Sequence, residues 1–311
     1  MYNKINASSI AYKCMACDSN KVACIEPQRG LFYVCCRECG HSSALLKGDD
    51  VALSFNEAQH KYYGETSLLI DTKPDIFETE ILARRKTVLA AFLSPASNVI
   101  EVGPGGGHVL GMLLAQGHNV TAIEHSPVLA RHLSERFKIT VMNGEFETID
   151  LPPVMYDAFC SFHVIEHVRD PIAHLRKGYS LVRSGGLTFV ATPNALSWQQ
   201  KLFEPLSPNF DAAHLHVFSK KSLINLCNQC GWEVVSVLTP DYATEWIKVI
   251  TKVIRRIRGE DEGQTAGKYA RSSSKLVKFI AGALRMGTSP LRLIQSKLGY
   301  GNEIFLILRK P

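Results

Sequence analysis

Short apolar runs alternate with amphipathic stretches along the middle of the chain, from about residue 60 to residue 240. The apolar runs indicate buried strands, and the amphipathic stretches indicate helices. We predict strands at Val99–Val102, Val120–Glu124, Ile139–Met142, Tyr156–Phe162, Leu187–Ala191 and Trp232–Leu238, and helices at His108–Ala115, Pro127–Phe137, Pro171–Leu181 and Lys220–Cys230. This alternation predicts a mainly parallel sheet with helices on both faces. Ligands then bind at the edge where the carboxyl ends of the strands meet.

The pattern changes on both sides of this region. The first 45 residues are rich in cysteine, and residues 241–299 are helical and basic. A last strand-like run, Glu303–Arg309, follows the basic part. We therefore predict a cysteine-rich segment at 1–45, an α/β domain at 60–240 that residues 300–311 complete, and a basic helical insertion at 241–299.

The cysteine-rich segment holds two pairs, Cys14 with Cys17 and Cys36 with Cys39. Their C-x2-C-x18-C-x2-C spacing is typical of structural Zn²⁺ sites. In such a site four thiolates close a tetrahedron and leave no position open for chemistry. We favour a zinc-ribbon-like segment, and the alternative is four buried or free cysteines. Cys35 adjoins the second pair, but Cys36 is the residue that fits the spacing.

A glycine loop follows the first predicted strand of the α/β domain, in the sequence VIEVGPGGGHVL. Glycines at such a turn allow positive φ angles and let a ligand approach the backbone. The next strand ends in Glu124, whose carboxylate can accept hydrogen bonds from ribose hydroxyls. These features also fit NAD binding, but Glu101 and Pro104 depart from the G-x-G-x-x-G dinucleotide fingerprint.

The pattern E-x-G-x-G-x-G resembles motif I of the class I S-adenosylmethionine-dependent methyltransferases, in their methyltransferase-23-like branch. Four later stretches resemble further segments of this family in the same order: Asn143–Glu147, Tyr156–Pro171, Ser184–Asn194 and His214–Val235. The resemblance implies a Rossmann-like, doubly wound α/β fold. One branch of the family carries a zinc ribbon ahead of this domain, often among enzymes of polysaccharide and lipid-linked glycan biosynthesis.

The same resemblance implies S-adenosyl-L-methionine as cofactor and assigns residues to its parts. The loop would pass under the methionine part, Glu124 would bind the ribose, and Glu145 with the backbone of Phe146 would bind the adenine. The cofactor-binding residues that it implies are Glu101, Gly103, Gly105, Gly107, Glu124, Glu145 and Phe146.

The stretch CSFHVIEHVRDP leaves the fourth predicted strand at this same edge. Three interpretations stay open for it. One histidine can act as a general base oriented by a carboxylate. Alternatively, His163, Glu166, His167 and a later histidine can bind a divalent cation, although some relatives have a glutamate in place of His163. Finally, Glu166 and His167 can cap the following turn and helix. Our catalytic candidates are His163, His167 and His214, and His216 is a further histidine that could face the same cleft.

The function that these motifs favour is methyl transfer to an oxygen of a small-molecule or glycan/lipid-linked acceptor. One alternative is an RNA 2′-O-methyltransferase, with the ribbon and the basic segment as RNA contacts. Another is a non-catalytic zinc-ribbon binding protein with a degenerate methyltransferase fold. The intact glycine loop with Glu101, Glu124 and Glu145 argues against degeneracy.

Positive charge is concentrated in the insertion. The chain has a formal net charge of +6, whereas Lys248–Lys297 contains 12 Lys and Arg against 3 Asp and Glu. The sequence TEWIKVITKVIRRIR there predicts an amphipathic helix typical of membrane interfaces. Its predicted apolar side holds Trp246, Ile247, Ile250, Val253, Ile254 and Ile257, and its basic side Lys248, Lys252, Arg255 and Arg256. The alternative is a helix packed on the domain with a solvated basic face, and nucleic-acid binding is less favoured because no aromatic-rich basic surface accompanies the charge.

The chain shows no signal-peptide pattern and no run of 18 apolar residues. We therefore expect a cytoplasmic protein, with peripheral contact at the inner membrane surface as an option. In that compartment the nine cysteines stay reduced and serve as ligands or core residues.

Overall fold

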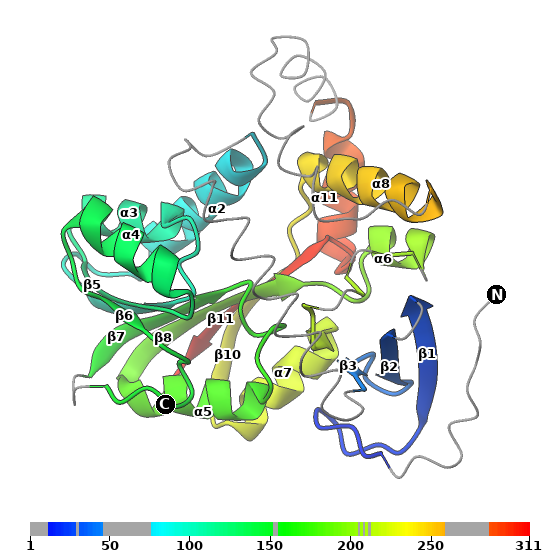
Figure 1. Ribbon diagram of the computed structural model, residues 1–311, viewed down its shortest axis with the longest axis horizontal. Coiled ribbons are helices and arrows are strands. Elements are labelled where there is room, and N and C mark those ends of the chain that lie inside the picture. Colours follow the sequence, from blue (N-terminus) through cyan, green and yellow to red (C-terminus); the bar gives the residue numbers. More distant parts are fainter. Residues whose placement is uncertain are drawn as a thin grey trace.

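The computed structural model describes residues 12–28, 31–45, 76–151, 155–204, 206–207, 209–210, 213–258 and 286–311. Its main sheet has seven strands in the order β10-β11-β8-β7-β4-β5-β6 (Figure 1). The strands are β4 (Asn98–Val102), β5 (Asn119–Glu124), β6 (Val141–Asn143), β7 (Tyr156–Phe162), β8 (Val182–Pro193), β10 (Glu233–Leu238) and β11 (Glu303–Arg309). Strands β4 to β8 run parallel, and β11 lies antiparallel between β8 and β10. This is the Rossmann-like α/β fold that the sequence predicts.

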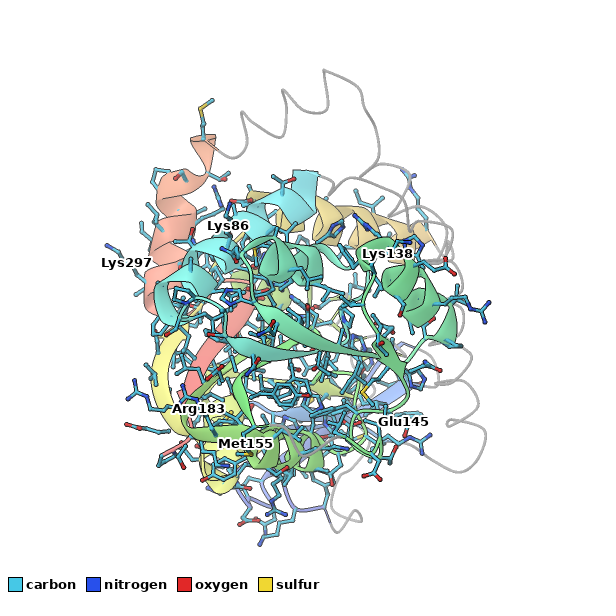
Figure 2. The ribbon with its side chains drawn as sticks, turned by 90° about the vertical axis from the view of Figure 1, so that its left-hand side faces the viewer. Lys86, Lys138, Glu145, Met155, Arg183 and Lys297 are labelled. Atoms are coloured by element: carbon cyan, nitrogen blue, oxygen red, sulfur yellow. The ribbon has the colours of Figure 1, made fainter. Side chains whose placement is uncertain are left out.

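Helices cover both faces of this sheet (Figure 1). On one face, Leu89 and Leu113 pack with Phe189 and Phe305 of the strands. On the other face, the sheet packs against α5 and α7 through a second core. The helices are α2 (Ile76–Phe92), α3 (His108–Ala115), α4 (Pro127–Phe137), α5 (Pro171–Leu181), α6 (Trp198–Phe203) and α7 (Lys220–Gln229). Side chains fill the space between the helices and the sheet (Figure 2).

Short polar residues fix where these helices begin. The side chain of Ser126 caps α4, Asp170 caps α5, and Ser219 forms a capping box on α7. Proline at the first helical position of α4 and α5 favours the same start, because its fixed φ suits a helix and its missing N–H needs no partner. The loop after each strand is thereby held short, and it opens at the carboxyl edge of the sheet.

The predicted strands and helices all occur. Several of them, such as Tyr156–Phe162 and Pro127–Phe137, have the predicted bounds, and the others have shifted ends. Strand β8 begins at Val182, because Val182 pairs with Tyr156 before a register shift reaches the pair Ala158 and Leu187. Strand β6 covers Val141–Asn143, so Ile139 lies outside it.

A second, four-stranded sheet contains the cysteine-rich segment. Its order is β1-β2-β3-β9. Strands β1 (Val22–Gln28), β2 (Leu31–Cys36) and β3 (Ser42–Ala44) come from this segment, whereas β9 (His216–Val217) comes from the chain before α7. The cysteine-rich segment therefore shares a sheet with the rest of the protein, which the sequence pattern does not predict.

In the described part of the chain between β10 and β11 lie the helices α8 (Ala243–Arg258) and α11 (Ser289–Leu298). Helix α8 is amphipathic, as we predicted, but only part of its apolar side is buried. Val253 is buried and the Trp246 indole donates to Asp241, whereas Ile250, Ile254 and Ile257 are exposed. Helix α8 packs against α2 and α6, and this packing buries fewer of its apolar side chains than the sequence pattern suggests. The side chains of Ile247, Lys248, Lys252, Arg255 and Arg256, and all of residues 259–285, lie outside the described residues. No helix in the described ranges is both long and apolar enough to cross a bilayer.

Candidate active site

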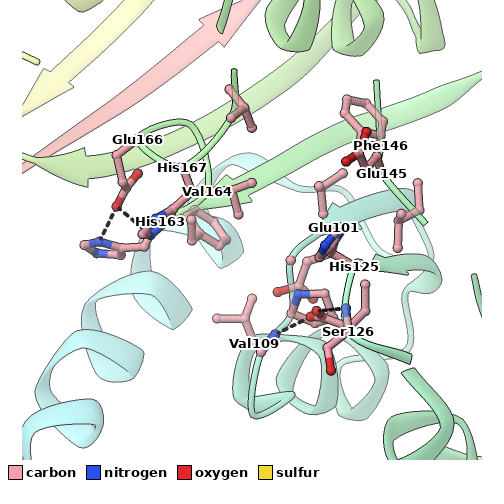
Figure 3. Close-up of a pocket in the computed structure, with 18 of the residues that line it drawn as sticks. Glu101, Val109, His125, Ser126, Glu145, Phe146, His163, Val164, Glu166 and His167 are labelled. Atoms are coloured by element: carbon pink, nitrogen blue, oxygen red, sulfur yellow. Dashed lines mark hydrogen bonds and ion pairs between the residues drawn. The ribbon is translucent and has the colours of Figure 1, made fainter. Parts of the chain in front are cut away.

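A cavity of about 780 Å³ opens at the carboxyl edge of the sheet. Its walls come from the loops after β4, β5, β6 and β7, from α2, and from Ala213 and His214 ahead of β9. Figure 3 shows two groups of polar side chains across this cavity: His163, Glu166 and His167 on one side, and Glu101, Ser126 and Glu145 on the other. The predicted catalytic histidines and the predicted cofactor residues, apart from Gly107, therefore line the same cavity.

The glycines of the first loop have distinct roles. Gly103, Gly105 and Gly107 all have positive φ, at 65°, 53° and 74°. A Cβ at Gly103 would lie 2.6 Å from the Val164 side chain, and one at Gly107 would collide with Leu133. A Cβ at Gly105 would meet no atom within 4 Å, although this residue lines the cavity. Gly105 thus leaves open space where a ligand can approach the backbone.

Two buried carboxylates lie beside this loop. Glu124 accepts hydrogen bonds from the backbone N–H groups of Ser126, at 2.9 Å, and of Gly105, at 3.2 Å. Among the residues that the structure describes, Oε2 of Glu101 has no hydrogen-bond partner. Burial raises the pKa of Glu101 to about 8, and it also raises the pKa of Glu124. Burial therefore keeps Glu101 largely protonated at neutral pH, and a cationic or hydrogen-bond-donating ligand would favour its ionised form.

The loop after β6 holds the predicted adenine residues. Phe146 is buried and stacks on Phe159, with ring centroids 5.3 Å apart. Glu145 is exposed at the rim of the cavity. The next residue, Glu147, accepts a hydrogen bond from Nδ1 of the buried His174 at 2.6 Å. The sequence gives no periodic signal for this bond, which fastens the loop to α5.

His163 is the centre of the opposite group. It has a φ of 55°, which is unusual for a residue other than glycine and typical of strained functional positions. Its Nε2 donates to Glu303 at 2.8 Å, and its Nδ1 forms an ion pair with Glu166 at 3.2 Å. Tyr242 and Arg85 also donate to the buried Glu303, at 3.0 Å and 3.4 Å.

Sequence reasoning missed Glu303, Tyr242 and Arg85. They come from β11, the chain ahead of α8, and α2, so no local motif joins them to His163. A signal existed for one of them, because Glu303 is a lone carboxylate at the start of the apolar run EIFLIL. A charge in such a run is buried only when it is paired.

The ion pairs of His163 set its protonation. Burial lowers the pKa of His163, but Glu166 and Glu303 outweigh this effect and raise the pKa to about 9. The ring is therefore an imidazolium at neutral pH, and it forms ion pairs with two carboxylates. Near neutral pH such a group donates hydrogen bonds and does not accept a proton.

This arrangement predicts a pH-dependent stability. Because the folded pKa exceeds the unfolded value, the contribution of His163 is complete below about pH 6.5 and is lost as the pH rises through about 9. We expect His163→Asn, which tolerates positive φ, to lower the free energy of unfolding by about 1 kcal/mol at pH 6, after allowance for the 39% exposure of the ring. Urea unfolding of both proteins from about pH 6 to pH 9.5 measures the difference. A difference that does not shrink with pH contradicts the assignment.

His167 and His214 differ from His163 in their hydrogen bonds. Nδ1 of His167 donates to the carbonyl of Ala213 at 2.7 Å, and Nδ1 of His214 donates to that of Asn209 at 3.0 Å. In the neutral form each ring then has its lone pair on Nε2. The two rings lie 4.9 Å apart and both line the cavity.

Two expectations for this region differ from the structure. His216 is buried in β9 and does not line the cavity. The cap of α5 is Asp170, so Glu166 and His167 do not cap that helix. Glu166 instead accepts a hydrogen bond from Thr192 at 2.9 Å.

The four cysteines of the two predicted pairs lie together outside this cavity. Their sulfur atoms all lie within 4.8 Å of one another, and the pairs Cys14–Cys39 and Cys17–Cys36 have Sγ–Sγ distances of 3.5 Å. Cys35 is not part of this cluster.

The chain is similar in sequence to known methyltransferases. A probable S-adenosylmethionine-dependent methyltransferase from Mycobacterium tuberculosis is 27% identical over 157 residues, which cover 49% of this chain and 57% of that protein. The ubiquinone biosynthesis O-methyltransferase of Xanthomonas campestris is 34% identical over 113 residues, covering 34% of this chain and 47% of that protein. The chain thus spans about half the length of these two curated relatives.

The fold resembles that of a solved structure, and the sequence matches a methyltransferase family. The cyclopropane synthase MmaA2 from Mycobacterium tuberculosis shares the fold, with a TM-score of 0.54 and 15% identity over 82% of this chain and 98% of that one. The family described as "Methyltransferase domain" matches residues 76–237. Because this match includes the glycine loop, the cavity-lining strands and more than half of the 311 residues, the chain belongs to the methyltransferase domain family.

Proposed function

We propose that the protein is an S-adenosylmethionine-dependent methyltransferase that methylates an oxygen of a small-molecule or glycan/lipid-linked acceptor. One observation carries this proposal: the glycine loop with its two carboxylates and the three histidines line the same cavity. A methyl donor and an acceptor must meet in one water-excluding space for in-line transfer. The relative from Xanthomonas campestris is an O-methyltransferase, which supports transfer to oxygen here as well.

The residues of one half of the cavity fit S-adenosyl-L-methionine. When bound, this cofactor supplies a methyl group on a positively charged sulfur. Glu101 offers an unpartnered carboxylate oxygen to a cationic group, and Glu124 retains lone pairs for ribose hydroxyls. Gly105 leaves room for the ligand against the backbone. Gly103 and Gly107 instead allow close packing under the loop.

The residues of the other half fit an uncharged hydroxyl acceptor. His163 and Arg85 offset the charges of Glu166 and Glu303, so these four side chains have no net charge at neutral pH. In transfer to a hydroxyl, the new O–C bond forms while the C–S bond breaks, and the hydroxyl proton needs an acceptor. We assign that proton to His167 or His214, because the carboxylates keep His163 protonated.

A second candidate uses the same residues differently. One ligand atom each from Glu166, His167 and His214 lies within 4.8 Å of the others, which is compatible with a divalent cation. Such a cation would hold acceptor oxygens and lower the pKa of a hydroxyl. Loss of methyl transfer on dialysis against a chelator, with recovery in Mg²⁺ or Mn²⁺, favours this candidate over a histidine base. RNA 2′-O-methylation and a non-catalytic binding role are the remaining alternatives.

We also infer that the four-cysteine cluster binds structural Zn²⁺. A tetrahedral site with Zn–S bonds of about 2.3 Å has sulfur atoms about 3.8 Å apart, close to the 3.5 Å of the pairs Cys14–Cys39 and Cys17–Cys36. Four protein ligands would close this site, so the metal would stabilise the fold and take no part in transfer.

The exposed isoleucines of α8 support a peripheral contact with an anionic membrane. Ile250, Ile254 and Ile257 lie at helical spacing on one exposed face, in the most basic part of the chain. Lys297 also projects outward from α11 (Figure 2). A cationic helix with an exposed apolar face is suited to such a surface.

We expect this face to determine binding to vesicles. Flotation with phosphatidylglycerol-containing vesicles should recover the wild type, and Ile254→Asp with Ile257→Asp should lower recovery at least tenfold, since charges in the acyl region oppose burial. Leu202→Asp is the control, because Leu202 is an exposed apolar residue of α6. Equal recovery of the double variant and the wild type would sink the membrane proposal.

Calorimetric titration with S-adenosylhomocysteine tests the proposed function itself. We expect binding in the micromolar range and, with labelled S-adenosylmethionine, transfer to members of a panel of hydroxylated sugars, lipid-linked glycans and RNA ends. Absence of binding at millimolar ligand contradicts the methyltransferase proposal. Transfer to RNA alone favours that alternative.

A further inference from the structure

The cysteine-rich segment and the acceptor side of the cavity are joined by backbone hydrogen bonds. Strand β3 pairs with β9, with Ser42 opposite Val217 and Ser43 opposite His216. The backbone N–H of Ala44 also donates to the carbonyl of Leu215 at 2.8 Å. The segment of residues 213–217, which carries His214, is therefore an edge of the ribbon sheet.

One side chain of the ribbon contacts His214 itself. The hydroxyl of Tyr33 donates to the carbonyl of His214 at 2.6 Å, and Tyr33 is fully buried. The Tyr33 ring meets Phe210 edge-on at 4.9 Å, next to Asn209, whose carbonyl accepts from Nδ1 of His214. Tyr33 thus supports both the backbone of His214 and the loop that orients its imidazole.

The same segment is bonded to the His163–His167 loop on its other side. The N–H of His216 donates to the carbonyl of Glu166 at 3.0 Å, and Nδ1 of His167 donates to that of Ala213. A displacement of residues 213–217 would therefore move His167 and His214 together. In the described parts of the ribbon, residues 12–28 and 31–45, no residue lines the cavity.

The cysteine cluster is fastened to α7, immediately after this segment. Ser219, which caps α7, donates to the carbonyl of Cys39, and Lys221 donates to that of Glu38 at 3.0 Å. Cys14, Cys36 and Cys39 belong to the same hydrophobic core as Phe218. The cysteine cluster is therefore joined by short contacts to the chain that follows β9.

We propose that Tyr33 is a positioning residue for His214, and that the four-cysteine site controls the acceptor half of the cavity while leaving the cofactor half unchanged. This inference rests on the proposed function, which assigns one half of the cavity to the cofactor and the other half to the acceptor. The structural coupling itself does not depend on that function. When the four thiolates are held together, β2 and β3 are ordered, and these strands keep residues 213–217 in place.

Tyr33→Phe tests the inference, because it removes the hydroxyl and keeps the ring against Phe210. We expect backbone amides of residues 213–217 to exchange hydrogen about five times faster in this variant, as the loss of one buried hydrogen bond implies. Amides of the glycine loop, residues 101–107, should exchange as in the wild type. Tyr156→Phe is the matched control, since Tyr156 is also buried and its hydroxyl donates to Thr121, which lies outside residues 213–217.

Removal of metal from the full-length protein by a chelator tests the second part. We expect faster exchange in residues 213–217, reversal on addition of Zn²⁺ alone, and affinity for S-adenosylhomocysteine within twofold of the untreated protein. Unchanged exchange at residues 213–217 in both experiments overturns the inference, and so does an equal rise at residues 101–107. Failure to bind S-adenosylhomocysteine in any form contradicts the proposed function instead, while the exchange result still decides the coupling.

Discussion

Substitution of Gly105 by leucine should lower the affinity for S-adenosylhomocysteine at least 100-fold, about 2.7 kcal/mol. A Cβ at this position meets no protein atom within 4 Å and Gly105 lines the cavity, so the new side chain would occupy space that we assign to the cofactor. The positive φ of 53° adds a backbone cost of about 1 kcal/mol. Calorimetry gives the affinity, and thermal unfolding gives the stability change.

Gly117 offers a matched control for the backbone cost. It also has positive φ, 80°, and a Cβ there also meets nothing within 4 Å, but it lies outside the cavity. Gly117→Leu should therefore lower the melting temperature about as much as Gly105→Leu and leave ligand affinity within twofold. Equal affinity of the two variants would falsify the assignment of the cofactor to this loop.

The sequence predicts the glycine loop, Glu124 and the cysteine cluster well, because a few neighbouring residues determine each of them. The glycines follow directly on β4, and the acidic residue Glu124 ends β5, so strand order alone brings them to one edge. The spacing of the cysteines likewise predicts which four sulfur atoms meet. In each case a few consecutive residues determine the geometry, and the fold needs only to supply parallel strands.

The parts that the sequence does not predict depend on distant contacts. Glu303 reaches His163 from β11 across 140 positions, and Tyr33 reaches His214 across 181. Such pairs follow from how β11 inserts between β8 and β10 and how β9 joins the ribbon, which no periodic pattern specifies. The role of His163 changes for this reason, since two carboxylates from different elements convert a candidate base into an imidazolium.

Removal of the base should have the largest effect on turnover. We expect His167→Ala or His214→Ala to lower kcat between 100- and 1,000-fold on the hydroxyl acceptor, as loss of a general base does, with affinity for S-adenosylhomocysteine unchanged. The variant that lacks the base should also lose the acidic limb of the pH–rate profile. The other histidine then has an orienting role, because the two rings lie 4.9 Å apart.

His163→Asn separates this mechanism from its competitor. An imidazolium that already holds two carboxylates can position the acceptor, so its loss should lower kcat less than loss of the base and should retain the acidic limb. If His163→Asn abolishes the acidic limb while His167→Ala and His214→Ala keep it, the base is His163 and the ion pairs open on acceptor binding. If His167→Ala and His214→Ala lose activity that Mn²⁺ at high concentration restores, the two rings act as cation ligands with Glu166.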